Sequence, residues 1–197
     1  MMNRVPGVIE SMEQSKAIVI SPIGDIPSWI TEIVAKKVKK FFGFNTLIKP
    51  VLTDISFAFH PGRKQYHSTQ ILEHLAREAP PGTVKILGIT DEDLFIPILT
   101  HVYGEAQLDG TACIISISRL VRGTGVDIID TGSSRIVKEA VHELGHCFNL
   151  RHCKDAMCLM HYCRKLEDVD KKISQFCRYC DIILTDSIKS MGPNRIK

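Results

Sequence analysis

Apolar positions along the first 120 residues follow two alternating periods, which predicts strands and helices in turn. Short apolar runs rich in β-branched residues at 16–21, 83–90 and 113–118 are typical of buried strands, and a weaker strand is expected near 46–52. Helical spacing predicts a helix after Pro27 that stops at Gly43, and another over 65–79. A short edge strand is expected within 102–108. The pattern predicts a mixed α/β (α+β) domain.

One further helix is expected, and after it the pattern changes. Apolar residues at helical spacing predict a helix over 135–148, with Ser133 or Ser134 as its N-cap. Beyond Asn149 the chain becomes Cys-rich and basic, and its periodicity weakens. We therefore expect an N-terminal subdomain of residues 1–149 and a small, irregular, Cys-rich C-terminal subdomain of residues 150–197.

Composition excludes several classes of protein. The 197 residues are 44% hydrophobic and 24% charged, which is unlike a disordered or collagen-like chain. No apolar run approaches the roughly 18 residues of a membrane span. The first fifteen residues hold no apolar stretch of the kind that secretory signals carry. These features predict a soluble, cytoplasmic protein without a membrane partner.

Cysteine and charge are unevenly distributed. Six of the seven cysteines lie between residues 147 and 180, and four of the eight histidines lie in or beside that stretch. Residues 151–197 carry ten Lys/Arg against six Asp/Glu, whereas the formal net charge of the whole chain is only +3. Clustered Cys and His in a chain without a secretory signal indicate metal binding rather than disulfides.

The predicted helix contains the motif H-E-x-x-H at His142-Glu143-Leu-Gly-His146. Histidines at i and i+4 lie about one helical turn apart, so both imidazoles can reach one Zn²⁺ ion. Glu143 can then take a proton from a water held at that ion. The alternative is a solvated helix face with two incidental histidines. The apolar stripe that contains Val141 and Leu144 lies opposite the two histidines, which favours the metal site.

A third histidine strengthens the metal interpretation. His152 lies ten residues after His142 and reaches the same ion only if the helix ends soon after His146 and turns sharply. Asn149 stands where that turn is needed, and asparagine tolerates the left-handed backbone conformation. We therefore predict that His142, His146 and His152 are the ligands of a catalytic zinc ion.

Four cysteines have the spacing of a second metal site. Cys153-x₄-Cys158 and Cys177-x₂-Cys180 form two pairs of thiolates, and structural zinc takes four such ligands. The alternative is a set of reduced, buried thiols. Cys163 competes with Cys158 as a fourth ligand, although it lacks a partner at the usual spacing.

The motif resembles that of a known family. The segment from His142 to His152 is similar to the metzincin signature H-E-x-x-H-x-x-G-x-x-H, with Asn149 in place of the glycine. The cysteines that follow resemble those of the archaemetzincins. The resemblance implies a metzincin-like zincin fold with a mixed twisted sheet, an active-site helix, Met160 in a Met-turn beneath the zinc histidines, and a second, structural zinc at the cysteines.

These observations together predict a zinc metallopeptidase that hydrolyses peptides or proteins, with two Zn²⁺ ions per chain and Glu143 as the catalytic base. Two interpretations of the 102–108 strand stand equally: an edge strand with which an extended peptide pairs, and an ordinary strand of the sheet. The runners-up are a catalytically weak or inactive zinc-binding scaffold and a nucleic-acid-binding module built on the cysteine site. The small charge excess and the few aromatic residues near the cysteines make nucleic acid the weaker alternative. The residues carry no signal for the oligomeric state.

Overall fold

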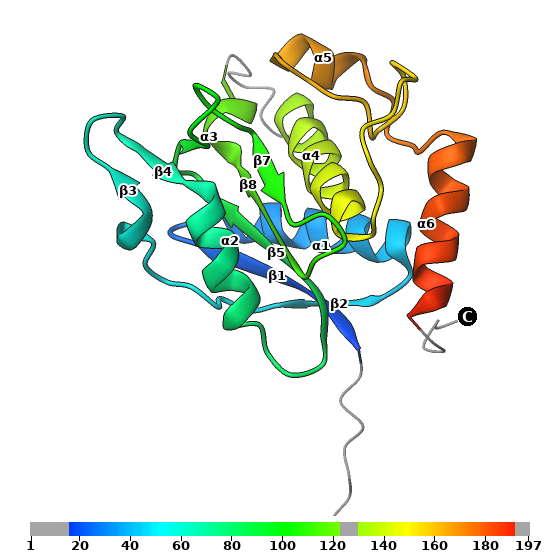
Figure 1. Cartoon of the computed structure of the whole chain (residues 1–197), viewed down its shortest axis with the longest axis horizontal. Coiled ribbons are helices and arrows are strands. Elements are labelled where there is room, and N and C mark those ends of the chain that lie inside the picture. The colour runs from blue at the N-terminus through cyan, green and yellow to red at the C-terminus, as the bar shows by residue number, and fades with distance from the viewer. Residues whose placement is uncertain (1–15, 123–129, 192–197) are drawn as a thin grey trace, which may run out of the picture.

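The computed structural model describes residues 16–122 and 130–191, and its centre is a five-stranded sheet (Figure 1). The strands are β1 (Ala17–Ile23), β2 (Asn45–Ile48), β5 (Thr83–Thr90), β7 (Gly104–Ala106) and β8 (Ala112–Ser116). Their order is β2-β1-β5-β8-β7. The first four run parallel, and β7 pairs antiparallel with β8 at one edge.

Helices cover both faces of this sheet. Helices α1 (Ser28–Phe42) and α4 (Thr131–Cys147) lie on one face, and α2 (Ser68–Arg77) lies on the other (Figure 1). Successive residues of β1 point to opposite faces, so Ile18 and Ile20 join the α1–α4 cluster while Val19 joins the α2 cluster. A sheet buried on both faces explains why its strands are nearly continuous apolar runs.

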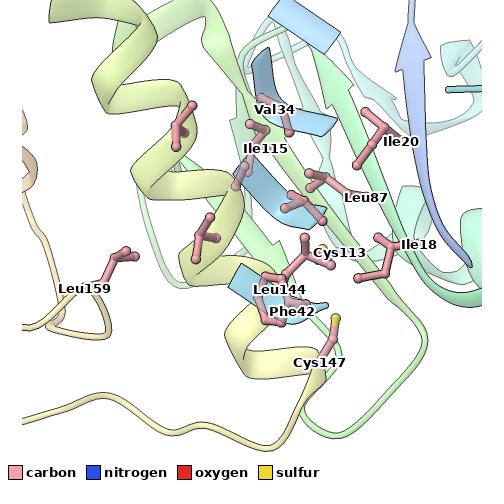
Figure 2. Packing of buried hydrophobic residues seen from close by; sticks show 14 of the residues in the cluster. Ile18, Ile20, Val34, Phe42, Leu87, Cys113, Ile115, Leu144, Cys147 and Leu159 are labelled. Carbon is pink, nitrogen blue, oxygen red and sulfur yellow. The ribbon is translucent and has the colours of Figure 1, made fainter. Parts of the chain in front are cut away.

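The larger core lies between the sheet and α4 (Figure 2). Leu144 of α4 packs in it with Phe42 of α1 and Leu87 of β5, and all three side chains are almost fully buried. Leu159, from the segment after α4, belongs to the same cluster. This packing fixes α4 rigidly against the sheet.

Smaller elements complete the fold. A second sheet joins β3 (Phe59–His60), β4 (Gln65–His67) and β6 (Leu94–Phe95), and the 3₁₀ turn η1 (Ser56–Ala58) precedes it. Helix α3 (Ile117–Leu120) follows β8. Helices α5 (Leu166–Lys171) and α6 (Arg178–Ser190) lie in the C-terminal part. Among the residues described, no helix is long and apolar enough to cross a membrane.

The predicted mixed fold and several of its elements are confirmed. Strand β5 has the predicted bounds, and α1 begins directly after Pro27. Gly43 ends α1 with φ of 75°, a left-handed value that favours glycine. The edge strand predicted within 102–108 is β7, although it is shorter than expected.

Other predicted bounds are wrong for local reasons. The expected helix over 65–79 begins as β4, which pairs with β3 and β6, and α2 starts only at Ser68. The strand expected at 113–118 ends at Ser116, whose hydroxyl caps α3 by accepting a hydrogen bond from the Ser118 amide. The strand expected near 46–52 is limited to β2.

The helix that carries the H-E-x-x-H motif also starts earlier than predicted. It begins at Thr131 after Asp130, so neither Ser133 nor Ser134 is its N-cap. Ser133 is buried, and its hydroxyl donates to the Asp130 carbonyl. The polar, Gly-containing sequence of 122–134 predicts a connection before this helix; residues 123–129 of it lie outside the described residues, and its last residues belong to α4.

The C-terminal part is more regular than the sequence pattern indicates. It contains α5 and the 13-residue α6, which packs Leu184 and Ile188 into the main core. The division at residue 149 stays a prediction. Residues from both sides of it share one hydrophobic cluster.

Candidate zinc peptidase site

Helix α4 presents its motif residues toward a cleft beside β7. Contact between α4 and both β7 and β8 holds the helix at this edge of the sheet. His142 and Glu143 are each only 5% exposed, and both line the cleft together with His146. The apolar stripe of the helix packs on the opposite side, as its spacing predicts.

A sharp turn after α4 brings the third histidine back to the first two. Asn149 adopts φ of 66°, which confirms the predicted left-handed turn. The Leu150 amide then donates to the Gly145 carbonyl at 2.9 Å and closes the helix end. One ligand nitrogen from each of His142, His146 and His152 lies within 4.8 Å of the others.

Backbone carbonyls orient two of the three imidazoles. Nδ1 of His142 lies 2.9 Å from the Leu159 carbonyl oxygen, and Nδ1 of His146 lies 2.7 Å from that of Leu150. A hydrogen bond donated from Nδ1 leaves the Nε2 lone pair free to bind a metal. The two Nε2 atoms face each other at 3.2 Å. This donor set suits Zn²⁺, which prefers imidazole nitrogen in tetrahedral geometry.

Burial also holds these imidazoles in the neutral, metal-binding form. It lowers the pKa of His146 to about 4 and that of His142 well below its ordinary value. The pKa of His152 is lowered for the same reason. At neutral pH all three rings therefore keep a lone pair available for a metal ion.

Glu143 is held close to the edge strand. A Cβ atom at Gly104 of β7 would lie 2.6 Å from Cγ of Glu143 and 2.8 Å from the Ile114 carbonyl oxygen. Only glycine permits this approach. Burial, followed by the charge of Glu139, raises the pKa of Glu143 well above its usual range. The carboxyl group therefore has a high proton affinity, as a proton-transferring group requires.

The cleft has a volume of about 820 Å³ and runs between β7 and the segment after α4. One wall comes from the loop before β7 and from β7 itself, and the other comes from residues 151–172. Titratable groups from both walls and from α4 line it, among them His101, Glu105, Glu139, Arg151, Arg164 and Lys172. Apolar side chains at its mouth include the exposed Leu99 and Leu108.

Met160 lies directly against α4, the helix that carries the H-E-x-x-H motif. It is fully buried, and a Cβ at Gly145 would lie 2.6 Å from its sulfur atom. Gly145 separates His142 from His146 on the helix, so the thioether packs beneath the histidine pair. This contact agrees with the place that the resemblance implies for Met160.

The four predicted cysteines also come together. The sulfur atoms of Cys153, Cys158, Cys177 and Cys180 lie within 4.8 Å of one another. Cys153 and Cys177 approach to 3.7 Å, and the Cys177 amide donates to the Cys158 sulfur at 3.3 Å. Such a set of four converging thiols suits Zn²⁺ in a closed tetrahedral site. Cys163 lies outside this group and lines the cleft instead.

The cleft contains functional groups that the sequence patterns did not single out. Glu139 lies one helical turn before Glu143, a spacing that was visible in the sequence. Glu105 accepts hydrogen bonds from Ser68 and Thr69 at the start of α2. Lys172 has no motif around it, and only the fold brings it to the cleft. Tyr162 also lines the cleft, and its ring centroid lies 5.0 Å from that of His152.

This fold and site define a zinc-dependent peptidase class, and comparison with known proteins gives the family. The model described as Peptidase family M54 matches residues 33–186. An archaemetzincin of Archaeoglobus fulgidus is 35% identical over 164 residues, covering 83% of this chain and 95% of that protein. One of Methanocaldococcus jannaschii is 34% identical over 166 residues, covering 83% and 89%.

Solved structures agree with these sequence matches. The crystal structure of the Methanopyrus kandleri archaemetzincin superposes with a TM-score of 0.79 at 30% identity, covering 92% of this chain and 99% of that one. The A. fulgidus archaemetzincin complexed with malonate gives 0.73 at 33% identity, covering 85% and 99%. The chain therefore belongs to peptidase family M54, the archaemetzincins, and is a zinc metallopeptidase. The resemblance seen in the sequence is confirmed.

Proposed function

We propose that the chain hydrolyses peptide bonds at a zinc ion held by His142, His146 and His152, with Glu143 as the base. The observation that carries this proposal is the convergence of the three imidazoles within 4.8 Å beside a buried carboxyl group. Zinc bound there supplies a Lewis acid that polarises a carbonyl group and favours the ionisation of water.

Glu143 performs the proton transfers in this proposal. It accepts a proton from the attacking water and passes it to the leaving amine as the peptide bond breaks. Burial of its side chain supports this role because a raised pKa lets the carboxyl group hold the proton between the two steps. Gly104 leaves room for the Glu143 side chain at the edge strand, because a Cβ added there would lie only 2.6 Å from Cγ of Glu143.

The substrate is a peptide, and we propose that it binds in extended form along β7. This strand is an edge strand of the central sheet, and its residues line the cleft together with Glu143. A peptide added at such an edge gains backbone hydrogen bonds without depending on its sequence. The strand thus orients the peptide bond to be cleaved toward the three histidines.

We further propose that Cys153, Cys158, Cys177 and Cys180 hold a second, structural zinc. Support comes from the sequence spacing of the two pairs and from the closeness of their sulfur atoms. This site joins the segment after α4 to the start of α6, two parts of the chain that are separated in sequence. A zinc ion bound there would stabilise the C-terminal part of the chain, which has little hydrophobic core of its own.

Replacement of Glu143 by alanine tests the catalytic proposal. We expect peptidase activity to fall by roughly 10²–10⁴-fold, since general acid–base catalysis contributes about that factor, while zinc remains bound. Glu73→Ala on the exposed side of α2 is the matched control and should retain activity. Full activity in a zinc-loaded Glu143→Ala protein would refute the role of Glu143.

A further inference from the structure

Lys172 is a buried cation in the cleft that forms no ion pair with a carboxylate of the described residues. It is only 2% exposed, and it lines the cleft together with Glu139 and Cys163. Its ammonium lies 3.4 Å from the His161 carbonyl oxygen and interacts with the Cys163 thiol. Within the described part of the chain, no carboxylate oxygen lies within 4.0 Å of it.

Burying a lysine ammonium without an anionic partner costs free energy of folding. An ammonium has three N–H donors, and an isolated charge in a poorly solvated place strongly favours an anionic partner. A carbonyl at 3.4 Å is a long and weak acceptor. The side chain therefore retains donors that can bind an anionic group in the cleft.

The chain around Lys172 is docked onto α4 by several strong contacts. Arg135 forms two hydrogen bonds to the Asp170 carboxylate, at 2.7 and 2.8 Å. Lys138 donates to the carbonyls of Val169 and Asp170, at 3.0 and 3.2 Å. These contacts fix α5 against α4, which lies beside it (Figure 1). Lys172, the buried residue that directly follows α5, lines the cleft.

The alternative is that Lys172 serves as an internal counter-ion for the glutamates of α4. Glu139 is the main candidate, because it is buried, lines the cleft and has an Oε2 atom without a hydrogen-bond partner among the described residues. An internal ion pair would have brought the two groups within 4.0 Å. Burial also raises the pKa of Glu139 on balance, although the charge of Lys172 acts in the opposite direction, and the raised pKa favours the neutral carboxyl group. Glu139 thus leaves the charge of Lys172 incompletely balanced.

We infer that Lys172 is a specificity residue that binds a carboxylate group of the substrate, so that the enzyme prefers peptides with an acidic residue facing this end of the cleft. Arg151 and Arg164 on the same wall add to the positive potential that an acidic peptide meets. This inference rests on the proposed function, because it assigns the class of peptide that the same site takes.

The test compares matched peptides that differ only in charge. Eight-residue peptides carry glutamate or glutamine at each position in turn, and kcat/KM is measured for every pair with the zinc-loaded protein. At one position the wild type should prefer glutamate by about tenfold or more, as expected for a hydrogen bond to a charged group. The Glu/Gln ratio should fall toward one in Lys172→Met, which keeps the aliphatic stem.

Two further variants separate recognition from folding. Lys172→Arg keeps the charge and should retain the preference for glutamate. Lys171→Met removes the adjacent but exposed lysine, which does not line the cleft, and should leave the Glu/Gln ratio as in the wild type. Thermal unfolding of all three variants identifies any that fail to fold. A Glu/Gln ratio that Lys172→Met leaves unchanged, or the absence of any preference in the wild type, would overturn the inference.

Binding measurements keep this inference distinct from the proposed function. Affinities of the same peptide pairs are measured by calorimetry in the zinc-loaded Glu143→Ala background, where cleavage is not needed. A preference for glutamate that depends on Lys172 supports the inference even if the wild type cleaves nothing, in which case only the proposed function fails. Equal affinity for both peptides, or no binding of either, overturns the inference.

Discussion

The histidine and cysteine clusters are both suited to zinc, yet they differ in what surrounds them. The histidines face a cleft of about 820 Å³ and have a buried carboxyl group beside them. The four cysteines lie apart from that cleft, at the junction between the segment after α4 and α6. A site with three protein ligands leaves a position for chemistry, whereas a site with four is closed. The same ion would therefore serve catalysis at the histidines and structure at the cysteines, because the two sites differ in the number of protein ligands and in access to a cleft.

The two clusters are also mechanically connected. Cys153 directly follows His152, and its amide donates to the Met160 carbonyl at 2.9 Å. Met160 in turn packs against Gly145 beneath the histidine pair. We therefore expect the cysteine site to hold the third histidine in place, as ligand-supporting contacts do at other metal sites.

Loss of two cysteines should produce the largest effect. Cys177→Ser/Cys180→Ser removes two of the four proposed ligands of the structural zinc. The free energy of unfolding should fall by several kcal/mol, since metal binding at such a site is coupled to folding. Zinc affinity at the histidines should also fall by roughly tenfold or more. Chemical denaturation and zinc titration measure the two effects.

Cys163→Ser is the matched control for that experiment, because Cys163 lies outside the cysteine cluster. It should retain both metal ions. If the double variant loses only C-terminal stability while zinc binding at the histidines is unaffected, the proposed connection between the two clusters is wrong.

An intermediate effect is expected at Gly104, where the edge strand meets the catalytic base. In Gly104→Ala the new methyl group would overlap Glu143 and the Ile114 carbonyl, so either the strand or the base must move. Overpacking of this kind costs about 1–3 kcal/mol of stability, and a displaced base should lower kcat more than it raises KM.

Gly62→Ala provides the comparison for Gly104. A Cβ at Gly62 has only ordinary contacts, the nearest being the His60 ring at 3.4 Å. Stability and kcat should therefore change little. Equal effects of the two substitutions in steady-state kinetics and denaturation would show that the approach of β7 to Glu143 has no special importance.

The smallest effect is expected at the Asp170–Arg135 ion pair, which docks α5 on α4. The hydrogen bonds from Arg135 lower the pKa of Asp170 below its ordinary value of 3.8. A carboxyl group with a lowered folded-state pKa stabilises the fold above its unfolded pKa, and this is lost as the pH falls through the folded value. Because the Asp170 side chain is 41% exposed, Asp170→Asn should cost less than about 1 kcal/mol at pH 7.

The pH dependence of that difference provides the check. Urea unfolding of wild type and Asp170→Asn should converge as the pH is lowered below about 4, because protonation removes the same charge in the wild type. Asp186→Asn breaks a largely exposed pair with Lys189 and should change stability little at any pH. A stability difference between wild type and Asp170→Asn that persists at low pH would contradict the assignment.

Local sequence patterns predicted the parts of the fold in which one period dominates. The apolar run 83–90 and the helix ended by Gly43 have the expected bounds, because burial on the sheet and a left-handed glycine are both local signals. The segment 65–79 begins instead as a strand, since pairing with β3 and β6 overrides the helical spacing. Strand pairing depends on segments that are distant in sequence, so the local spacing of apolar residues cannot predict it.

Helix α6 was missed for a different reason. Its outward face carries Ile182 and Ile183, each about half exposed, so apolar residues do not mark the buried side alone. Its first turn also contains Cys180, which the cysteine spacing had assigned to a metal site. The weak amphipathic signal therefore resembled an irregular segment.

The candidate site shows the same division. The spacing of His142, His146 and His152 predicted their convergence, because the helical repeat and the turn at Asn149 determine it. Glu105 and Lys172 carry no such spacing and come from segments that only the folded sheet and the docked α5 bring to the cleft. Their chemistry therefore became visible only with the tertiary structure.

The central claim is that the chain holds two zinc ions at two separate sets of ligands, one for catalysis and one for structural support. Metal content measured by mass spectrometry tests it most directly. We predict two zinc ions per chain in the wild type and one in His142→Ala/His146→Ala, which keeps all four cysteines. One zinc or none in the wild type, or two zinc ions in the double variant, would contradict the claim.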